Sequence, residues 1–254
     1  MGTLALLLVQ ALAASSNWAG YAVSGSTFTD VKGTWVQPAV TCTLPASTYS
    51  AFWVGLGGTD ESNGGLEQTG TESNCENGQP VYDAWYELLP DGSVRVPIDV
   101  SAGDTISAEV SVDGSVATLT VTDVTTDQTF TTQQTPSALD TSSAEWIAEA
   151  PSRCFGDRCL PLQLANFGTV QFSGSSTTAN GHVGTISDAS WSSTSIELGG
   201  SAGSAEPAAL TPDGSGFSVM FTPPQTQPVV APVKKKVAKP KPKRHRHKAA
   251  TPAA

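Results

Sequence analysis

Short runs in which apolar and polar residues alternate dominate the chain between residues 15 and 221. In the clearest of them, residues 106–112, every second residue is apolar. Successive side chains of a β-strand point to opposite faces, so this pattern predicts strands with one buried face. Outside the first residues of the chain, no helical spacing of apolar residues lasts longer than a turn or two. We therefore expect no long helix.

Turn signals separate these runs. Asp113-Gly114 is a two-residue hairpin signal, and Ala117, Leu119 and Val121 alternate after it. Many short strands over roughly 200 residues predict an all-β sandwich or barrel, here a single domain of residues 15–221. The other strand-like runs are residues 32–36, 51–56, 81–88, 94–100, 168–172, 195–198 and 217–221.

The two ends of the chain differ from this body. Residues 4–14 are apolar, too short to span a bilayer, and end in the small-x-small pattern Ala11-Leu12-Ala13. This predicts that residues 1–14 are a signal peptide remnant, with a buried N-terminal helix as the alternative. Residues 222–254 are rich in Pro, Ala and Lys, which predicts a disordered basic tail.

Charge is distributed unevenly along the chain. Nine of the 13 basic residues lie in residues 234–248, whereas all 23 acidic residues precede residue 222. The body keeps only Lys32, Arg95, Arg153 and Arg158 as cations. Such a body repels itself at neutral pH and less so in acid, where carboxylates near their ordinary pKa of about 4 become protonated. The pattern is typical of a protein suited to acid, or merely of an acidic exported protein.

The basic tail has several interpretations. Its charge could contact an anionic cell wall, a membrane surface or the acidic body of the same chain. A solvated tail without a specific partner is equally compatible with this composition. We expect no nucleic-acid partner for an exported protein.

Four cysteines, Cys42, Cys75, Cys154 and Cys159, occur without a Cys-x-x-Cys pair or a neighbouring histidine. An even number of this kind predicts two disulfides in a secreted, extracellular protein rather than a zinc site. We favour the pairings Cys154–Cys159 and Cys42–Cys75, although spacing leaves the other two connectivities open.

The body offers little for histidine-based catalysis. Its single histidine, His182, lies in a turn-like sequence, so a Ser-His-Asp or Cys-His site is not expected. We also expect neither a metal site nor a cofactor. Carboxylate chemistry remains as the most natural choice for an acid-suited protein.

Five short motifs give a more specific indication. They are Ser-Asn-Trp-Ala-Gly at 16–20, Trp-Val-Gly at 53–55, Gln-Thr-Gly at 68–70, Tyr-Asp-Ala-Trp-Tyr-Glu at 82–87 and Ala-Glu-Trp-Ile-Ala-Glu at 144–149. In this order and spacing, the chain resembles the glutamic peptidases, or eqolisins, in the form of a bacterial-type secreted member. The resemblance covers residues 15–221. It implies a concanavalin-like antiparallel sandwich of two packed, curved sheets with a substrate groove on a concave face.

The resemblance also implies a catalytic dyad of Gln68 and Glu149. Glu149 would take a proton from the attacking water and return it to the leaving amine, while the amide of Gln68 would stabilise the oxyanion. Glu145 lies four residues before Glu149, so a regular strand points both to one face and spacing does not choose between them. The resemblance favours Glu149. It predicts an endopeptidase most active in acid and fading towards neutrality.

Further residues of the site follow from the same motifs. Trp18, beside Asn17, and Trp53, Glu72, Asp83 and Glu87 are expected to bind substrate, and Trp85 or Tyr86 either floors the groove or packs in the core. The expected partners are protein or peptide substrates, bound by a monomer.

The chain departs from the family in its turns. Gly57-Gly58 stands where members commonly have an aspartate after Trp-Val-Gly, and Pro151 where another acid is frequent. Subsite preference is therefore open.

Two other functions compete with this interpretation. A glycoside hydrolase on a similar sandwich would use a carboxylate pair such as Glu87 and Glu149. A non-catalytic module could attach to the cell wall through the tail. Gln68 distinguishes the first rival, since a neutral amide contributes little to glycoside hydrolysis.

Overall fold

The computed structural model describes residues 11–43, 46–60, 62–155 and 158–223. The tail from residue 224 and most of the predicted signal remnant lie outside these residues. In the described part of the chain, no helix is long and apolar enough to cross a membrane. The strands are β1 (Ala11–Ser15), β2 (Trp18–Ser24), β3 (Phe28–Val36), β4 (Ala51–Gly57), β5 (Leu66–Glu76), β6 (Gln79–Leu88), β7 (Val94–Val96), β8 (Thr105–Asp113), β9 (Val116–Asp123), β10 (Gln128–Gln134), β11 (Ser143–Glu149), β12 (Ser152–Phe155), β13 (Arg158–Pro161), β14 (Thr169–Ala179), β15 (His182–Thr185), β16 (Ser192–Leu198), β17 (Ser204–Pro207) and β18 (Phe217–Thr222).

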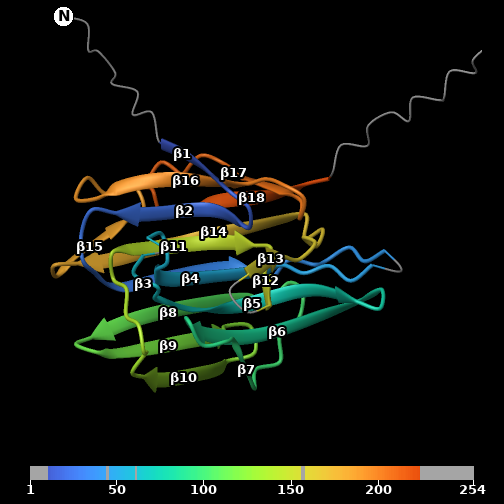
Figure 1. Cartoon of the computed structure of the whole chain (residues 1–254), viewed down its shortest axis with the longest axis horizontal. Helices are drawn as coiled ribbons and strands as arrows, with labels where there is room; N and C mark the ends of the chain where they lie inside the picture. The colour runs from blue at the N-terminus through green and yellow to red at the C-terminus, as the bar shows by residue number, and fades with distance from the viewer. Residues whose placement is uncertain (1–10, 44–45, 61, 156–157, 224–254) are drawn as a thin grey trace, which may run out of the picture. The chain divides into compact units, whose positions relative to one another are not determined.

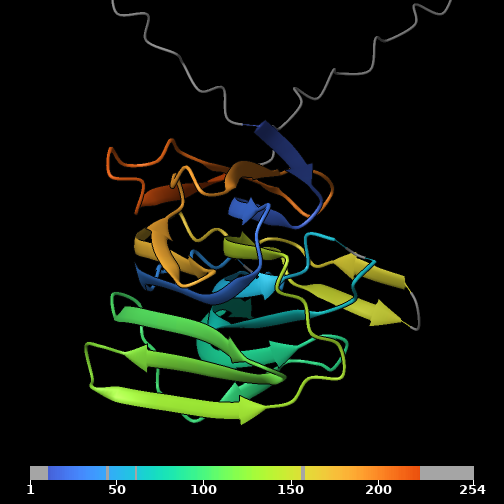
Figure 2. The same cartoon turned by 90° about the vertical axis from the view of Figure 1, so that its left-hand side faces the viewer.

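The strands confirm the predicted all-β sandwich. They follow one another in the order β10-β9-β8-β3-β14-β18-β17-β16-β2-β11-β4-β5-β6-β7. Neighbours in this order pair antiparallel, whereas β1 adds to β16 in parallel. The path turns back on itself, so that β3, β8 and β9 pack against β4, β5 and β11 (Figures 1 and 2). The two layers thus belong to one nearly closed sheet, joined through β18 and β17.

Some local predictions need correction. Asp113 pairs with Val116, so the two-residue loop is Gly114-Ser115 rather than Asp113-Gly114. The run at 94–100 is a strand only to Val96, because Pro97 has no amide hydrogen to continue the pairing. Residues 11–15 form strand β1 beside β16. Cleavage near Ala14 remains a prediction.

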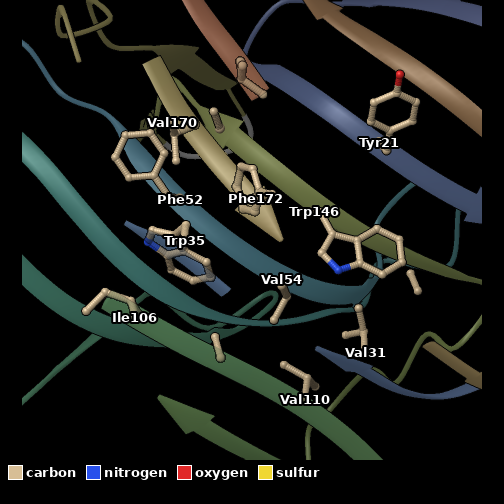
Figure 3. Packing of buried hydrophobic residues seen from close by; sticks show 14 of the residues in the cluster. Tyr21, Val31, Trp35, Phe52, Val54, Ile106, Val110, Trp146, Val170 and Phe172 are labelled. Atoms are coloured by element: carbon tan, nitrogen blue, oxygen red, sulfur yellow. The ribbon is translucent and has the colours of Figure 1, made fainter. Parts of the chain in front are cut away.

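The core lies between the two layers and is built from large side chains. Figure 3 shows Trp35, Phe52, Trp146 and Phe172 packed together with Val54. Both buried indoles are hydrogen-bonded: Trp35 donates to the Thr71 hydroxyl at 3.0 Å and Trp146 to the Lys32 carbonyl at 2.9 Å. A buried N–H without a partner would be costly. These bonds therefore fix the position of each ring between the layers.

Both favoured disulfides are present. Cys42–Cys75 ties the loop after β3 to the end of β5. Cys154–Cys159 closes the small hairpin of β12 and β13, which projects beside the main sheet (Figure 2).

Two acidic residues are completely buried in the sandwich. Glu67 and Glu145 have no exposed surface, and neither carboxyl makes a hydrogen bond of normal geometry to the described residues. Burial raises the pKa of Glu67 to about 8 and that of Glu145 well above its ordinary value. Both groups are therefore neutral in acid, where their burial costs least.

We predict that Glu67→Gln stabilises the protein near neutral pH. Above pH of about 4.3, the unfolded chain ionises at Glu67 while the folded chain keeps the proton, so stability falls as pH rises towards the folded pKa of about 8. Glutamine has the same size and stays neutral. At pH 8 the variant should melt at least about 5 °C above the parent, with little difference at pH 4.

The control is Glu206→Gln, which removes an exposed carboxyl of β17. Thermal melting followed by circular dichroism measures all three proteins. If the melting temperature of Glu67→Gln depended on pH as that of the parent does, Glu67 would not have the raised pKa assigned to it.

Candidate active site

Strand pairing places Gln68 and Glu149 on one face of the sheet. Glu149 of β11 pairs with Ala51 of β4, and Ala51 pairs with Glu72 of β5. Directly paired residues point the same way, and Gln68 lies an even four residues before Glu72 on the same strand. This is the face turned away from the core of Figure 3.

A cavity of about 260 Å³ opens on this face. It brings together Gln68, Glu149, Trp18, Glu72 and Glu87, five of the residues expected to be in the site. The full set of lining residues is Asn17, Trp18, Ala51, Leu66, Gln68, Glu72, Trp85, Glu87, Leu89, Ser93, Glu149, Pro151, Ser152, Cys154 and Cys159.

Two donors hold the carboxyl group of Glu149. Its Oε1 accepts a hydrogen bond from Asn17 Nδ2 at 3.0 Å, and its Oε2 accepts one from Trp53 Nε1 at 2.8 Å. Burial nevertheless raises the pKa of Glu149 to about 7, and the neighbouring charge of Glu87 adds to this. The two donors oppose the rise, because they favour the ionised form.

The turn between β1 and β2 positions Asn17. The Ser15 hydroxyl lies 3.2 Å from Asn17 Oδ1, as a donor to it, and accepts the backbone N–H of Trp18 at 3.0 Å. With its oxygen engaged by Ser15, the amide of Asn17 directs its nitrogen to Glu149. Ser15, the residue just before the motif Ser-Asn-Trp-Ala-Gly, therefore orients the asparagine of that motif.

Trp53 lies behind the cavity rather than in its wall. It is completely buried, and its ring packs edge-on against Trp18 with centroids 5.0 Å apart. Gly70 is its partner on β5. A side chain there would begin 2.0 Å from the Phe52 carbonyl oxygen, so only glycine fits at this position of Gln-Thr-Gly.

Gln68 is almost fully buried, with 4% of its surface exposed. Its Nε2 donates to Glu87 Oε2 at 2.6 Å, and its Oε1 has no partner among the described residues. Burial raises the pKa of Glu87, which the bond from Gln68 partly offsets. The amide nitrogen carries a second hydrogen, which remains for a group in the cavity.

Of the other two acids expected in the site, one lines the cavity and one does not. Glu72 lines it and accepts a hydrogen bond from Asn74, while burial raises the pKa of Glu72. Asp83 does not line it: its carboxylate pairs with Arg95 of β7. The structure thus places Asp83 beside the cavity, as it places Trp53 behind it.

Glu145 shares the face of Glu149 but not its surroundings. It is completely enclosed and absent from the cavity wall, whereas Glu149 is partly exposed there. Trp85 also lines the cavity, while the next residue, Tyr86, points the other way and stacks on Phe130. Because side chains alternate along β6, Trp85 faces the cavity and Tyr86 faces the opposite side of the sheet.

The β12–β13 hairpin contributes to the cavity in a way that no motif of the sequence indicated. Ser152, Cys154 and Cys159 form part of the wall. The sequence indicated this contribution only through the short separation of Cys154 from Glu149, which is five residues. The described residues contain no group of three or more His, Cys, Asp or Glu arranged to hold a metal ion. His182 bonds to Asp188 at 2.9 Å instead.

Known proteins match this chain in sequence and in fold. The model of the Peptidase A4 family matches residues 16–205. Aspergillopepsin-2 of Aspergillus niger is 32% identical over 198 residues, which cover 69% of this chain and 68% of that protein. Scytalidopepsin B of Scytalidium lignicola is 30% identical over 182 residues, covering 68% of each.

Solved structures extend this match to the fold. Scytalido-glutamic peptidase with a peptide-based transition state analog superposes with a TM-score of 0.69 at 26% identity, covering 82% of this chain and 99% of that chain. Aspergilloglutamic peptidase from Aspergillus niger gives 0.58 at 30% identity, covering 69% and 99%. The resemblance noted in the motifs is confirmed.

We predict that Trp53→Phe raises the pKa of Glu149. The change removes the indole N–H that bonds to the carboxylate but keeps an aromatic ring. A hydrogen bond to a charged group contributes about 1.5 kcal/mol or more, so the pKa should rise by about one. Carboxyl ¹³C NMR titration measures it, with Glu149→Gln to assign the signal. The control Trp191→Phe removes an indole N–H that donates to the Thr185 carbonyl. An equal pKa of Glu149 in the parent, in Trp53→Phe and in Trp191→Phe would contradict the role of Trp53.

Proposed function

Because the chain belongs to the Peptidase A4 family, a family of glutamic peptidases, we propose that it is an exported, acid-active endopeptidase with Glu149 and Gln68 as its catalytic dyad. One observation carries the assignment of the dyad. A partly buried carboxyl group of raised pKa and a buried amide with a free hydrogen line the same cavity. Such a pair suits acid–base catalysis beside an oxyanion donor.

The pKa of Glu149 determines the form that begins the reaction. With a pKa of about 7, only about one molecule in a thousand holds ionised Glu149 at pH 4. The protonated carboxyl can still transfer both protons. One oxygen accepts a proton from the attacking water while the other gives its own proton to the carbonyl oxygen of the scissile bond. The product is a neutral tetrahedral diol, and the carboxyl remains protonated.

Collapse of the diol reverses these roles. The carboxyl gives its proton to the amide nitrogen and accepts one from a hydroxyl of the diol. The C–N bond then breaks, and the amine and the new carboxylic acid leave. Throughout, Gln68 donates its free N–H to the oxygen that was the carbonyl oxygen. Loss of one donor of this kind costs about 10²–10³ in rate in other enzymes.

Other features support the acid-active and exported parts of the proposal. Glu67, Glu145, Glu72 and Glu87 all have raised pKa values because they are buried, and all are easiest to keep neutral in acid. Two disulfides favour an oxidising compartment outside the cell. We further propose a monomer that acts on proteins or peptides, with a tail that contacts an anionic cell wall or membrane surface.

We predict that Gln68→Ala and Glu149→Ala each abolish most proteolysis. Denatured protein is offered at pH 4, with β-glucan and xylan as parallel substrates. The expected losses in kcat/KM are at least about 100-fold for either variant, since each removes one part of the dyad. Gln134→Ala and Glu206→Ala, at exposed positions, are the controls and should keep full activity. Proteolysis that survives both dyad substitutions would reject the assignment. Sugar release without proteolysis would favour the glycosidase.

We also predict the pH dependence of kcat/KM. Because the protonated form of Glu149 is the active one, kcat/KM should be level in acid and fall about tenfold per pH unit above a pKa near 7. Activity regained on return to pH 4 and circular dichroism at each pH separate this loss from unfolding. A rate that climbs through the acid range up to pH 7 would show instead that Glu149 must be ionised.

A further inference from the structure

A second cavity adjoins the first on the same face of the sheet. It has a volume of about 630 Å³ and lies over β1, β16 and β2, neighbouring strands in Figure 1. Asn17, Trp18, Leu89 and Cys159 line both cavities. This shared boundary lies beside Glu149 and gives a peptide bound at the dyad a path into the second cavity.

The two cavities differ in charge. Glu72, Glu87 and Glu149 line the first, whereas none of the residues that line the second is charged. Ala22 and Ile196 contribute to the second cavity from β2 and β16. Ser15, Asn17, Ser24, Thr59 and Thr194 also line it, but none of these groups is charged. A charged side chain would lose its hydration here without gaining an ionic partner, whereas an apolar one can pack against Trp18, Ala22 and Ile196.

Gly58, in the Gly57-Gly58 turn, lines this cavity without a side chain. Both glycines have positive φ angles, 84° and 86°. A Cβ at Gly57 would lie 2.6 Å from the Cβ of Asp140, and one at Gly58 would lie 3.2 Å from the rings of Trp18 and from Leu66. Asp140 is buried, accepts the Gly58 N–H at 3.3 Å and does not line the second cavity. The absence of a side chain at position 58 thus leaves space beside Trp18.

We propose that the second cavity is a substrate subsite that binds a large apolar side chain, leucine or phenylalanine, next to the scissile bond and excludes lysine. This inference rests on the proposed peptidase function and adds the substrate class. Ala22, Thr194 and Ile196 follow the predicted signal remnant in sequence, so this part of the subsite is present with or without cleavage.

Thr194 gives a means to fill the cavity from one side. It pairs with Ala22, is partly exposed and lines the cavity from β16. A tryptophan at this position suits a strand and would occupy the space meant for the substrate side chain. Ala22→Leu would narrow the same space from β2.

The test uses internally quenched peptides at pH 4. The two positions on each side of the scissile bond carry Gly, Leu, Phe or Lys, one position at a time. At one position, Leu and Phe should exceed Gly and Lys by at least about tenfold in kcat/KM, the usual discrimination of an apolar pocket. Thr194→Trp and Ala22→Leu should each reduce the Phe-to-Gly ratio at that position about tenfold. The control Thr131→Trp, at an exposed position of β10, should leave the ratio unchanged.

The outcomes separate the two proposals. Cleavage of all peptides with no preference at any position, acceptance of Lys equal to that of Phe, or unchanged ratios in both folded variants would overturn the subsite and leave the peptidase function standing. Failure of the folded parent protein to cleave any peptide would overturn both. Thermal melting at pH 4 establishes that each variant is folded.

Discussion

The register of β11, β4 and β5 is the constraint on which the site depends. Because side chains alternate along a strand, a shift of one residue would turn Gln68 and Glu149 into the core and bring Trp146 and Phe52 out of it. Packing of those aromatic rings between the layers therefore holds the two polar residues on the opposite face. The chemistry of one face is fixed by the hydrophobic burial of the other.

Burial also explains the electrostatics of the molecule. Five glutamates in or beside the sheet have raised pKa values, chiefly because they are taken out of water. Only Glu149 combines this with two side-chain donors and a place in the cavity wall. In acid these glutamates are protonated, which lowers the cost of burying them. Under the same conditions Glu149 holds the proton that the proposed reaction uses. Stability and activity should thus depend on pH in the same direction.

Much of this organisation could be predicted from the sequence. Alternation and turn residues indicated an all-β sandwich, and cysteine spacing favoured the disulfides that form. Strands such as β10 escaped notice because their residues are mostly polar and are recruited by pairing with β9 rather than by burial. The closure of both layers into one sheet depends on long-range pairing through β17 and β18, which no local pattern encodes.

The site was predictable only in part, because spacing along a strand gives the face of a residue but not its burial. Spacing put Glu145 and Glu149 on one face, but only tertiary packing encloses one and exposes the other. The sequence likewise indicated only that Gly57-Gly58 replaces an acid of the family. In the fold, Asp140 accepts a hydrogen bond from Gly58 in this turn, and an uncharged cavity lies next to Trp18.

In the proposed reaction, Gln68 and Glu149 act on the same carbonyl group. A crystal structure with a peptide whose scissile carbonyl is replaced by a tetrahedral hydroxyl-bearing carbon tests this most directly. We expect the hydroxyl oxygen within about 3.2 Å of both Gln68 Nε2 and a carboxyl oxygen of Glu149. A hydroxyl bound to Glu72 or Glu87 and out of reach of Gln68 and Glu149 would contradict it.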